Sequence, residues 1–495
     1  MLTTLAAPAF AETWYIEKGD ITVKAGETGN DVTQNNVTTK NDTNTIITNR
    51  EDKASSNTVT IDANGKNDKV EVTLKDVNID TSSRNKAAVS VTGEGDTNIK
   101  LNGDNALKSD IYRSGIYGSG SGSLTISGGE NDSLTAQGGS GANGISSSGS
   151  LTISGGTVTA NGDDGGRGIS SSGSVTISGG STVTANGGNG TISGGDGICS
   201  SGGVTISGGS TVTANGGNGG SLVGGEGIRS GGGLTVSDGT VTAKGGNGDS
   251  KDGYGGDGIR SGGVVTISGN TVNAAGGSGG KVGGYGICSF DRVAISGGTV
   301  TANGGDGSSG GDGIRSGDID LSGSLELTAK AGSPNGKALS QRGNELDLDD
   351  IKDKLGPGAK VTATDANGET KQVSIPRPVE PEEPSSSSDG GSATPSTPAS
   401  PLPGLTVTDK SGAVISYTST QSGNTLTVCV GRFTASLRAS LSALRQLRAE
   451  GIETITFQTI LCSTTLSVDE LLAMGGEDAE AVLTHRLTDS SLTVG

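Results

Sequence analysis

The chain contains few large hydrophobic side chains for its length. Of its 495 residues only 30% are hydrophobic and 2% are aromatic, whereas 91 are glycine. Such a composition is typical of disordered or low-complexity chains, which cannot bury enough apolar surface to fold. No stretch approaches the roughly 20 apolar residues that a membrane-spanning helix needs. The composition therefore predicts neither a conventional globular core nor a membrane span.

Positive charge and histidine are also scarce. The 35 Lys and Arg residues face 53 Asp and Glu residues, which gives a formal net charge of −18. This balance argues against nucleic-acid binding, because phosphate recognition needs clustered Lys and Arg. The only histidine is His485, so histidine-based acid–base chemistry is excluded from the rest of the chain.

The four cysteines are too few for a disulfide scaffold. Cys199 and Cys288 occupy the same position in repeats three units apart. In a stack of strands this places them roughly 14 Å from each other, which is too far for a disulfide. Cys429 and Cys462 lie on predicted strands in the last part of the chain, and we hypothesise that they pair.

A degenerate repeat fills the middle of the chain. Each copy opens with Gly-Ile, and one copy reads GISSSGSVTISGGSTVTANGGNGTISGGD. The Gly-Ile openings fall at 144, 168, 197, 227, 258, 286 and 313, with spacings from 24 to 31 residues. A repeat of this size indicates a stacked architecture in which no single unit can bury its own apolar face.

Each repeat contains three short strand patterns. Val175 and Ile177 alternate with hydroxyl residues, Val183 and Ala185 do the same, and Ile169 centres a third, shorter strand. Glycine pairs between these segments supply the positive φ of tight corners. Three strands joined by corners and repeated in register predict an all-β fold, a parallel β-helix. The insertions between repeats gather after the second strand and predict one loop-rich face.

The regions outside the repeat predict further parts. Ala9-Phe10-Ala11 is a small-x-small pattern typical of a signal-peptidase site, which predicts export. The linker holds eight of the eleven prolines. The predicted parts are a signal-peptide remnant at 1–11, an N-terminal cap at 12–56, β-helix repeats at 57–345, a C-terminal cap at 346–375, a Pro/Ser-rich linker at 376–404 and a small α+β domain at 405–495.

The predicted small α+β domain combines strands with two helices. The apolar stripe Leu437, Leu441, Leu444 and Leu447 predicts a helix that ends at Gly451. The spacing of Ser467 and Glu470 is that of a capping box that opens a second helix. No motif in this part indicates a chemical activity.

The repeat region resembles a known family. The phrases DGIRS and TISGGTVTA, within residues 12–345, are similar to secreted repeat proteins of Gram-positive, gut-type bacteria whose β-helical part is called a carbohydrate-binding domain. The resemblance implies a right-handed parallel β-helix of the pectate-lyase type, binding to plant cell-wall polysaccharides, and bound calcium. The longer Gly-rich loops and the extra C-terminal domain depart from the family pattern.

Two polar columns flank the repeated Gly-Ile. The residue before the glycine is acidic in Asp196, Glu226, Asp257 and Asp312, which makes these four the candidate calcium ligands. The residue after the isoleucine is Arg229, Arg260 or Arg315, and such a column suits the carboxylates of an acidic sugar. The alternative is that the two columns only neutralise each other's charge.

Aromatic side chains offer a second hint of sugar binding, because sugar rings stack on them. Tyr254, Tyr285 and Phe290 come from neighbouring repeats, and with the three arginines they are the candidate ligand-binding residues. Chance scatter of three residues stays open as an alternative.

The sequence as a whole predicts a secreted or cell-surface, non-catalytic, monomeric β-solenoid that binds a polysaccharide. The alternative is a structural, adhesin-like stalk whose C-terminal domain makes the contact. An ice-binding surface built on Thr-x-Thr pairs such as Thr182 and Thr184, and a polysaccharide lyase or hydrolase, are weaker alternatives. The repeats are too uniform to single out a catalytic cluster.

Overall fold

The computed structural model describes residues 12–376 except 52 and 250, and residues 404–494 except 410–411, 416, 423, 431, 433, 460–462, 475–478 and 487–488. It divides into two compact units, Met1–Glu380 and Pro381–Gly495, whose buried hydrophobic clusters share no residue. The predicted signal-peptide remnant, nearly all of the linker, and Cys462 lie outside the described residues. Cys429 itself is described and is a free cysteine whose Sγ lies 3.6 Å from Gln458 Oε1, so the predicted disulfide with Cys462 is wrong.

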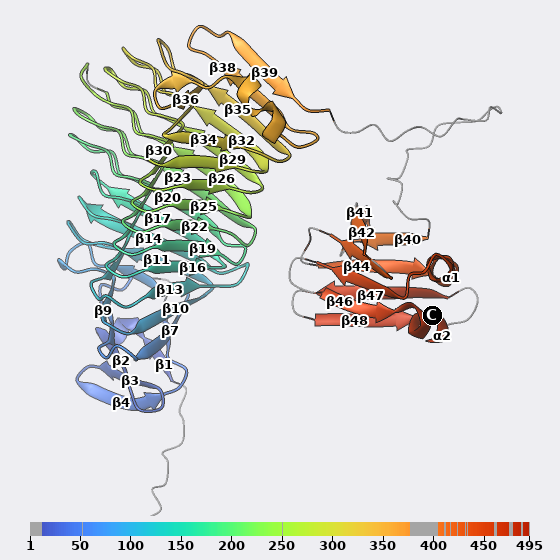
Figure 1. Ribbon diagram of the computed structural model, residues 1–495. Helices are drawn as coiled ribbons and strands as arrows, with labels where there is room; N and C mark the ends of the chain where they lie inside the picture. The colour runs from blue at the N-terminus through green and yellow to red at the C-terminus, as the bar shows by residue number, and fades with distance from the viewer. Residues whose placement is uncertain are drawn as a thin grey trace, which may run out of the picture. The chain divides into compact units, whose positions relative to one another are not determined.

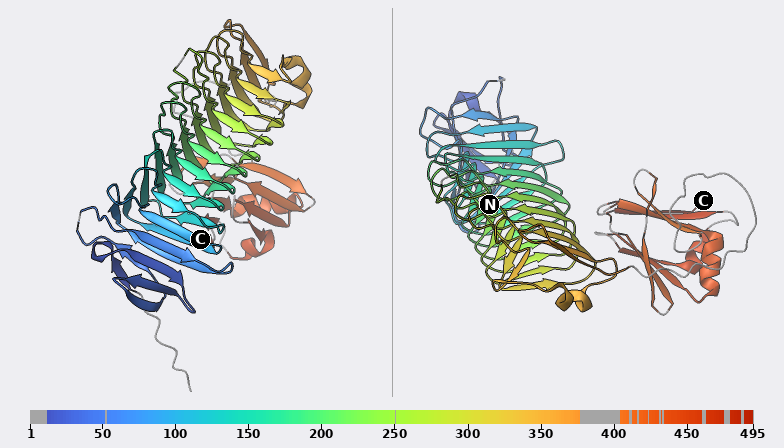
Figure 2. Two further views of the ribbon diagram at one scale, coloured as in Figure 1. Left: turned by 90° about the vertical axis from the view of Figure 1, so that its left-hand side faces the viewer. Right: turned by 90° about the horizontal axis from the view of Figure 1, so that it is seen from above.

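The first unit is a parallel β-solenoid of about 13 turns (Figure 1), which confirms the predicted fold class. Each turn adds one strand to each of three sheets, and Figure 2 shows the same stack from two further sides. The parallel strands of sheet A are β2 (Ile21–Ala25), β6 (Val59–Ala63), β9 (Val89–Gly93), β12 (Ile116–Gly118), β15 (Ile145–Ser147), β18 (Ile169–Ser171), β21 (Ile198–Ser200), β24 (Ile228–Ser230), β27 (Ile259–Ser261), β30 (Ile287–Ser289), β33 (Ile314–Ser316) and β36 (Leu339–Gln341).

The other two sheets complete each turn. Sheet B consists of β1 (Thr13–Tyr15), β5 (Ile46–Thr48), β7 (Lys69–Lys75), β10 (Asp96–Asn102), β13 (Leu124–Ser127), β16 (Leu151–Ser154), β19 (Val175–Ser178), β22 (Val204–Ile206), β25 (Leu234–Val236), β28 (Val265–Ile267), β31 (Arg292–Ile295) and β34 (Asp318–Leu321). The parallel strands of sheet C are β8 (Asn78–Asp80), β11 (Asp104–Lys108), β14 (Ser133–Ser140), β17 (Thr157–Asp163), β20 (Thr182–Asn186), β23 (Ser210–Asn215), β26 (Gly239–Lys244), β29 (Thr271–Ala275), β32 (Gly298–Asn303), β35 (Leu325–Lys330) and β38 (Lys360–Thr364).

The core is a set of stacked apolar columns. The isoleucine of each Gly-Ile pairs with the isoleucine of the next turn, as Ile169 does with Ile198. Val175 pairs with Val204 in sheet B, and Val183 with Val212 in sheet C. All these side chains are fully or almost fully buried. The inward orientation predicted from alternation is therefore confirmed, and the low hydrophobic content suffices because each turn needs only a few inward residues.

The Gly-rich segments are an ordered layer and not a row of solvated turns. Each segment leaves sheet C, runs outward and returns to sheet A, and glycines on its two limbs bond to each other and to the neighbouring turns. Gly217 donates to the carbonyl of Gly195, and Gly225 donates to that of Gly217, both at 2.8 Å. The same zigzag continues through Gly246, Gly256, Gly277, Gly284, Gly305 and Gly311, and we call this set with Gly195, Gly217 and Gly225 the glycine layer.

The glycine layer explains why one residue type dominates these segments. A Cβ atom built on Gly225 would lie 1.9 Å from the carbonyl oxygen of Gly195, and one on Gly246 would lie 1.9 Å from that of Gly217. Any side chain would therefore separate the limbs. The long limbs project from one edge of the solenoid (Figure 1) and form a wall beside sheet A.

Short elements close both ends of the solenoid. At the N-terminal end β3 (Asn30–Gln34) and β4 (Val37–Asp42) extend sheet A in antiparallel fashion, after the short 3₁₀ helix η1 (Ile16–Lys18). β1 and β2 already pair in parallel with strands of the stack, so the solenoid begins within the predicted cap. The other end lies at the predicted C-terminal cap. It contains the 3₁₀ helix η2 (Leu348–Lys354) and the strands β37 (Asn344–Glu345) and β39 (Thr370–Ser374), which pair antiparallel with β36 and β38.

The second unit contains two small sheets and two short helices. One sheet orders β41 (Val414–Ile415), β40 (Leu405–Thr408), β44 (Thr434–Ser440), β47 (Glu480–Arg486) and β48 (Asp489–Val494). The other orders β42 (Thr418–Ser422), β43 (Thr425–Cys429), β45 (Thr454–Gln458) and β46 (Ser463–Ser467), with β43 and β45 parallel. The helices are α1 (Leu441–Ala449) and α2 (Val468–Met474).

One helix prediction in this unit is wrong at its start. Leu437 lies on strand β44 and not on the helix, which begins at Leu441 after the N-cap Ser440. Ala435, Leu437 and Ala439 are all buried, so the segment follows the two-residue period of a strand. The single histidine, His485, is fully buried between Thr459 and Thr464. No helix in the described ranges is long and apolar enough to cross a membrane.

Candidate functional site

A groove runs along the solenoid between sheet A and the wall made by the glycine layer. It consists of two hollows of about 590 and 550 Å³ that meet at Val223, Glu226 and Arg229. The first hollow extends toward Arg315 and the second toward Asn143. Seven successive turns contribute to it, and at about 4.8 Å per turn the groove spans about 29 Å. It is long enough for an extended polymer.

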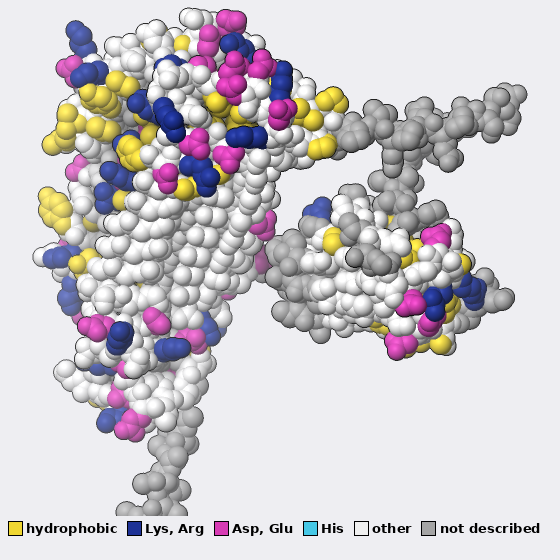
Figure 3. All heavy atoms as spheres, in the orientation of Figure 1, with side chains coloured by type: hydrophobic (Ala, Val, Ile, Leu, Met, Phe, Trp, Pro, Cys, Tyr) yellow, Lys and Arg dark blue, Asp and Glu magenta, His cyan; other side chains and the backbone are white. Residues whose placement is uncertain are grey.

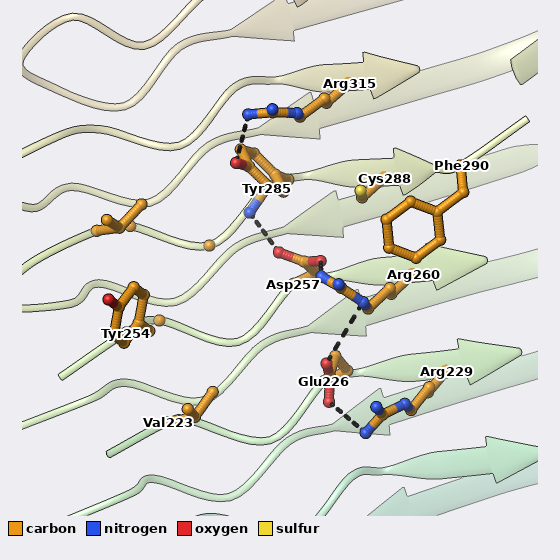
Figure 4. Close-up of a pocket in the computed structure, with 14 residues that line it drawn as sticks. Val223, Glu226, Arg229, Tyr254, Asp257, Arg260, Tyr285, Cys288, Phe290 and Arg315 are labelled. Carbon is orange, nitrogen blue, oxygen red and sulfur yellow. Dashed lines mark hydrogen bonds and ion pairs between the residues drawn. The ribbon is translucent and has the colours of Figure 1, made fainter. Parts of the chain in front are cut away.

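All six candidate ligand-binding residues line the first hollow. They are Arg229, Arg260, Arg315, Tyr254, Tyr285 and Phe290, drawn in Figure 4. Among the candidate metal ligands, Glu226 and Asp257 line the same hollow and Asp196 lines the second one. Asp312 lines neither, but its carboxylate lies 3.8 Å from Arg315. The acidic column and the arginine column identified in the sequence therefore both lie along this groove.

The arginine column follows from the register of sheet A. Arg229 pairs with Arg260, Arg260 with Cys288, and Cys288 with Arg315. Because each residue follows a buried isoleucine, the strand alternation turns its side chain outward. The guanidinium groups therefore lie along the groove floor.

The acidic column is built into the backbone of the groove. Asp196 accepts a hydrogen bond from the backbone N–H of Glu226 at 3.0 Å, and Asp257 accepts one from that of Tyr285 at 2.7 Å. Asp312 does the same for Lys337 at 2.9 Å. These three side chains are almost completely buried. Each of these acids therefore stabilises the limb of the next turn's Gly-rich segment that returns to sheet A, which is a structural role.

The same acids hold the arginines. Asp257 pairs with Arg260 at 2.9 Å, and Asp196 pairs with Arg167 at 3.0 Å. Arg229 makes longer ion pairs, 3.6 Å to Glu226 and 3.8 Å to Asp196. Every groove arginine has a carboxylate within 4.0 Å, so the arrangement matches the charge compensation weighed from the sequence.

The neighbouring carboxyl groups of Asp196 and Glu226 have pKa values shifted in opposite directions. Burial, the hydrogen bond to Asp196 and the charge of Asp196 raise the pKa of Glu226 to about 8. Burial acts to raise the pKa of Asp196 as well, but hydrogen bonds from Glu226 and the charge of Arg167 lower it overall. At neutral pH Glu226 therefore holds the proton and Asp196 the charge.

The three aromatic side chains each face a cation. The guanidinium of Arg260 lies 4.9 Å from the ring centre of Phe290, and that of Arg315 lies 4.9 Å from the ring centre of Tyr285. Arg315 also donates to the Tyr285 hydroxyl at 2.5 Å. Lys281 lies 5.3 Å from the ring centre of Tyr254. Phe290 is nevertheless 66% exposed.

The structure offers no ready metal site along this column. Among the described residues no three His, Cys, Asp or Glu side chains are arranged to hold a metal ion. Asp196, Glu226, Asp257 and Asp312 are engaged by arginines and backbone N–H groups instead. The four candidate calcium ligands thus lie where they were expected in the stack, but they do not converge.

The cysteines of the solenoid are unreactive. Cys199 and Cys288 are free, as their separation predicted. Burial raises the pKa of Cys199 to about 11 and that of Cys288 to about 12. Both therefore stay protonated thiols at neutral pH.

The threonines considered for ice binding form ordered columns on sheet C. Six of them pair in succession from turn to turn: Thr157, Thr182, Thr211, Thr240, Thr271 and Thr299. The neighbouring column is interrupted by Asn273 and the first column ends at Glu326. In the view of Figure 3 the broad middle of the solenoid face is free of charged and hydrophobic side chains.

Sequence reasoning missed three parts of the groove. Arg167 precedes Gly168 and so occupies the acidic column, a position that the repeat already marked. Val223 and Val282 flank Tyr254 in a column of isolated bridges between the loops. The glycine layer forms the wall itself, and no residue pattern distinguished it from flexible turns.

Comparison of the chain with models of known protein families, with curated proteins and with solved structures finds no match. The sequence resemblance to β-helical carbohydrate-binding repeat proteins is therefore not supported by a match. The parallel β-solenoid itself is what the structure shows.

Proposed function

We propose that the protein binds an extended polysaccharide, without cleaving it, along the groove between sheet A and the glycine layer. The observation that carries the proposal is the groove's continuity over seven turns, with the predicted arginines and aromatic residues lining it. Repeated weak contacts along a polymer add up as avidity. We further propose that the protein acts outside the cell, where such polymers occur.

The groove lining is suited to holding and not to reacting. Its arginines are neutralised by adjacent carboxyls, and its acids are tied to backbone N–H groups. Glu226 and Asp196 are hydrogen-bonded to each other. A pair in direct contact leaves no room between the groups for a sugar linkage and a water, as inverting hydrolysis requires.

A steric block tests the proposal. Val223 lies where the two hollows meet and is 37% exposed, so Val223→Trp should fill the groove without disturbing the core. We expect the full-length variant to bind a soluble polysaccharide at least about tenfold more weakly, because the polymer can then use only half of the groove. Affinity gel electrophoresis on gels containing each polymer measures the effect.

The neighbouring residue provides the control. Leu222 is more exposed than Val223 and lines neither hollow, so Leu222→Trp should leave binding unchanged. Equal weakening by both substitutions would place binding on the loop tips. No effect of Val223→Trp on a chain that binds would remove the groove from the function.

A further inference from the structure

The residues that line the groove differ from the repeat pattern at one place, where aromatic side chains occur. Residues 57–345 contain five aromatic side chains, and three of them, Tyr254, Tyr285 and Phe290, line the same hollow. The other two, Tyr112 and Tyr117, line neither hollow. These three aromatic residues therefore lie together at two adjacent turns.

Each of these rings differs from the residues at the same position of the two neighbouring turns. We compare the residue that follows each sheet A strand from β18 to β33. It is Phe290 in the turn of β30 and a serine or glycine in the other five turns, namely Ser172, Ser201, Gly231, Gly262 and Gly317. Tyr285 stands in the acidic column, and Tyr254 pairs with Val223 and Val282. None of the three substitutions fills the core.

The exposure of Phe290 has no structural explanation. Its ring is 66% exposed on a strand end where a glycine suffices in the neighbouring turns. Single exposed apolar residues are common on protein surfaces, but Phe290 shares its hollow with Tyr254 and Tyr285, and exposed apolar side chains that gather in a groove are typical of ligand-binding sites. Arg260 supports the ring at 4.9 Å and is itself held by Asp257 at 2.9 Å. The ring is thus presented in a fixed place.

The floor of the groove carries little net charge. Arg167, Arg229, Arg260 and Arg315 contribute four positive charges. Four acidic side chains, Asp196, Glu226, Asp257 and Asp312, lie beside them, and each arginine has at least one of these carboxyl groups within 4.0 Å. The positive charges of the floor are thus matched in number by acids, within a chain of net charge −18. Such a site does not attract polyanions strongly.

We infer that the polysaccharide held in this groove is uncharged, and that its sugar rings stack on an aromatic platform made of Phe290, Tyr254 and Tyr285. The inference rests on the proposed function and deepens it by naming the ligand class. Arg260 and Asp257 act as positioning residues for Phe290. Binding by stacking and hydrogen bonding requires neither a divalent cation nor low ionic strength.

The test compares polymers of both classes on the full-length protein. Affinity gels contain xyloglucan, galactomannan or hydroxyethyl cellulose as neutral polymers, and polygalacturonate or alginate as acidic ones. We expect retention by at least one neutral polymer and no retention by the acidic ones. Raising the salt from 0.05 to 0.5 M, or adding a chelator, should change the neutral affinity by less than about twofold.

Substitutions locate the contact. Phe290→Ala should weaken neutral-polymer binding about tenfold, since a stacked ring contributes roughly 1 kcal/mol or more beyond its buried area. Tyr117→Ala is the matched control, because Tyr117 is an exposed ring of the solenoid that lies outside the groove, and its removal should change binding by less than about twofold. Since both side chains are largely in solvent, both variants should fold as the parent does.

The outcomes separate the two proposals. Retention only by acidic polymers, lost at high salt, would overturn the uncharged ligand while the groove function survives. Neutral binding that is insensitive to Phe290→Ala would overturn the aromatic platform alone. Retention by none of the five polymers would count against both.

Discussion

At the scale of single residues, the most unusual chemistry is the pair of carboxyl groups formed by Asp196 and Glu226. Arg229 lies within 4 Å of both, and Arg167 and Arg260 each lie within 4.0 Å of one of them. Two negative charges on neighbouring buried groups repel each other, so Glu226 keeps its proton. The pair therefore links the stability of the groove to pH.

The sign of this link follows from the two states. The pKa of Glu226 is about 8 in the folded chain, against an ordinary value of 4.5 that applies when the chain unfolds. Between these values the folded state binds the proton more tightly, so stability falls as the pH rises from about 5 to about 8. Glu226→Gln keeps the shape without the titration. We expect it to flatten this part of the pH profile, removing a loss on the order of 2–4 kcal/mol.

Thermal unfolding followed by circular dichroism between pH 5 and 9 measures this effect. Glu94→Gln is the control, because Glu94 is an exposed glutamate on a bend of the same solenoid. Its melting curve should follow that of the parent chain at every pH. A Glu226→Gln variant with the parent's pH profile would show that the pair does not hold a proton.

The residues of the site were only partly predictable. The two columns followed from the Gly-Ile period, because equal positions of successive turns must stack. The meeting of Tyr254 with Phe290 did not follow, since Tyr254 belongs to a loop whose length differs from turn to turn. Its place depends on bridges to Val223 and Val282 that only the folded glycine layer creates.

At the scale of elements, the glycine layer turns the least regular part of the sequence into a wall. Its limbs are held by backbone hydrogen bonds of about 2.8 Å between turns. Glycine is needed there for close approach and not for an unusual φ, because Gly225, Gly246 and Gly256 do not have a positive φ. The wall is therefore sensitive to any added methyl group.

Gly256→Ala tests this view of the wall. The new Cβ would lie 2.0 Å from the carbonyl oxygen of Gly225, a backbone atom that cannot move freely. We expect a destabilisation of about 1–3 kcal/mol or more and a lower melting temperature. Gly269→Ala is the control, since its Cβ would meet nothing nearer than 3.5 Å, and it should shift stability by less than about 0.5 kcal/mol. Equal melting temperatures for the two variants would mean that the limbs are loosely packed.

The strands were more predictable than the helices. In the solenoid, strict alternation of Val, Ile and Thr permits only strands, and the register confirms them. Leu437 was placed wrongly because it fits two periods at once. It lies four residues before Leu441, as on a helix, and also alternates with Ala435 and Ala439, as on a strand. Sheet pairing with β40 and β47 decided the outcome.

At the scale of the whole molecule, the two units have separate cores. The buried cluster of the solenoid ends at Val373 and that of the second unit begins at Leu405. Stability in a solenoid comes from contacts between neighbouring turns, and both ends of this one are closed by antiparallel strands. Each unit therefore contains what it needs to fold alone.

Separate fragments decide whether the solenoid binds or only carries the second unit. We expect residues 12–376 to fold and to retain the whole affinity for the polymer that the full chain binds, because every residue of the groove belongs to them. Residues 404–495 should fold but not be retained. Circular dichroism checks folding and affinity gels check binding. If the solenoid fragment is folded and inert while the smaller fragment attaches, the molecule is a stalk, and the groove's aromatic residues would then have no part in attachment.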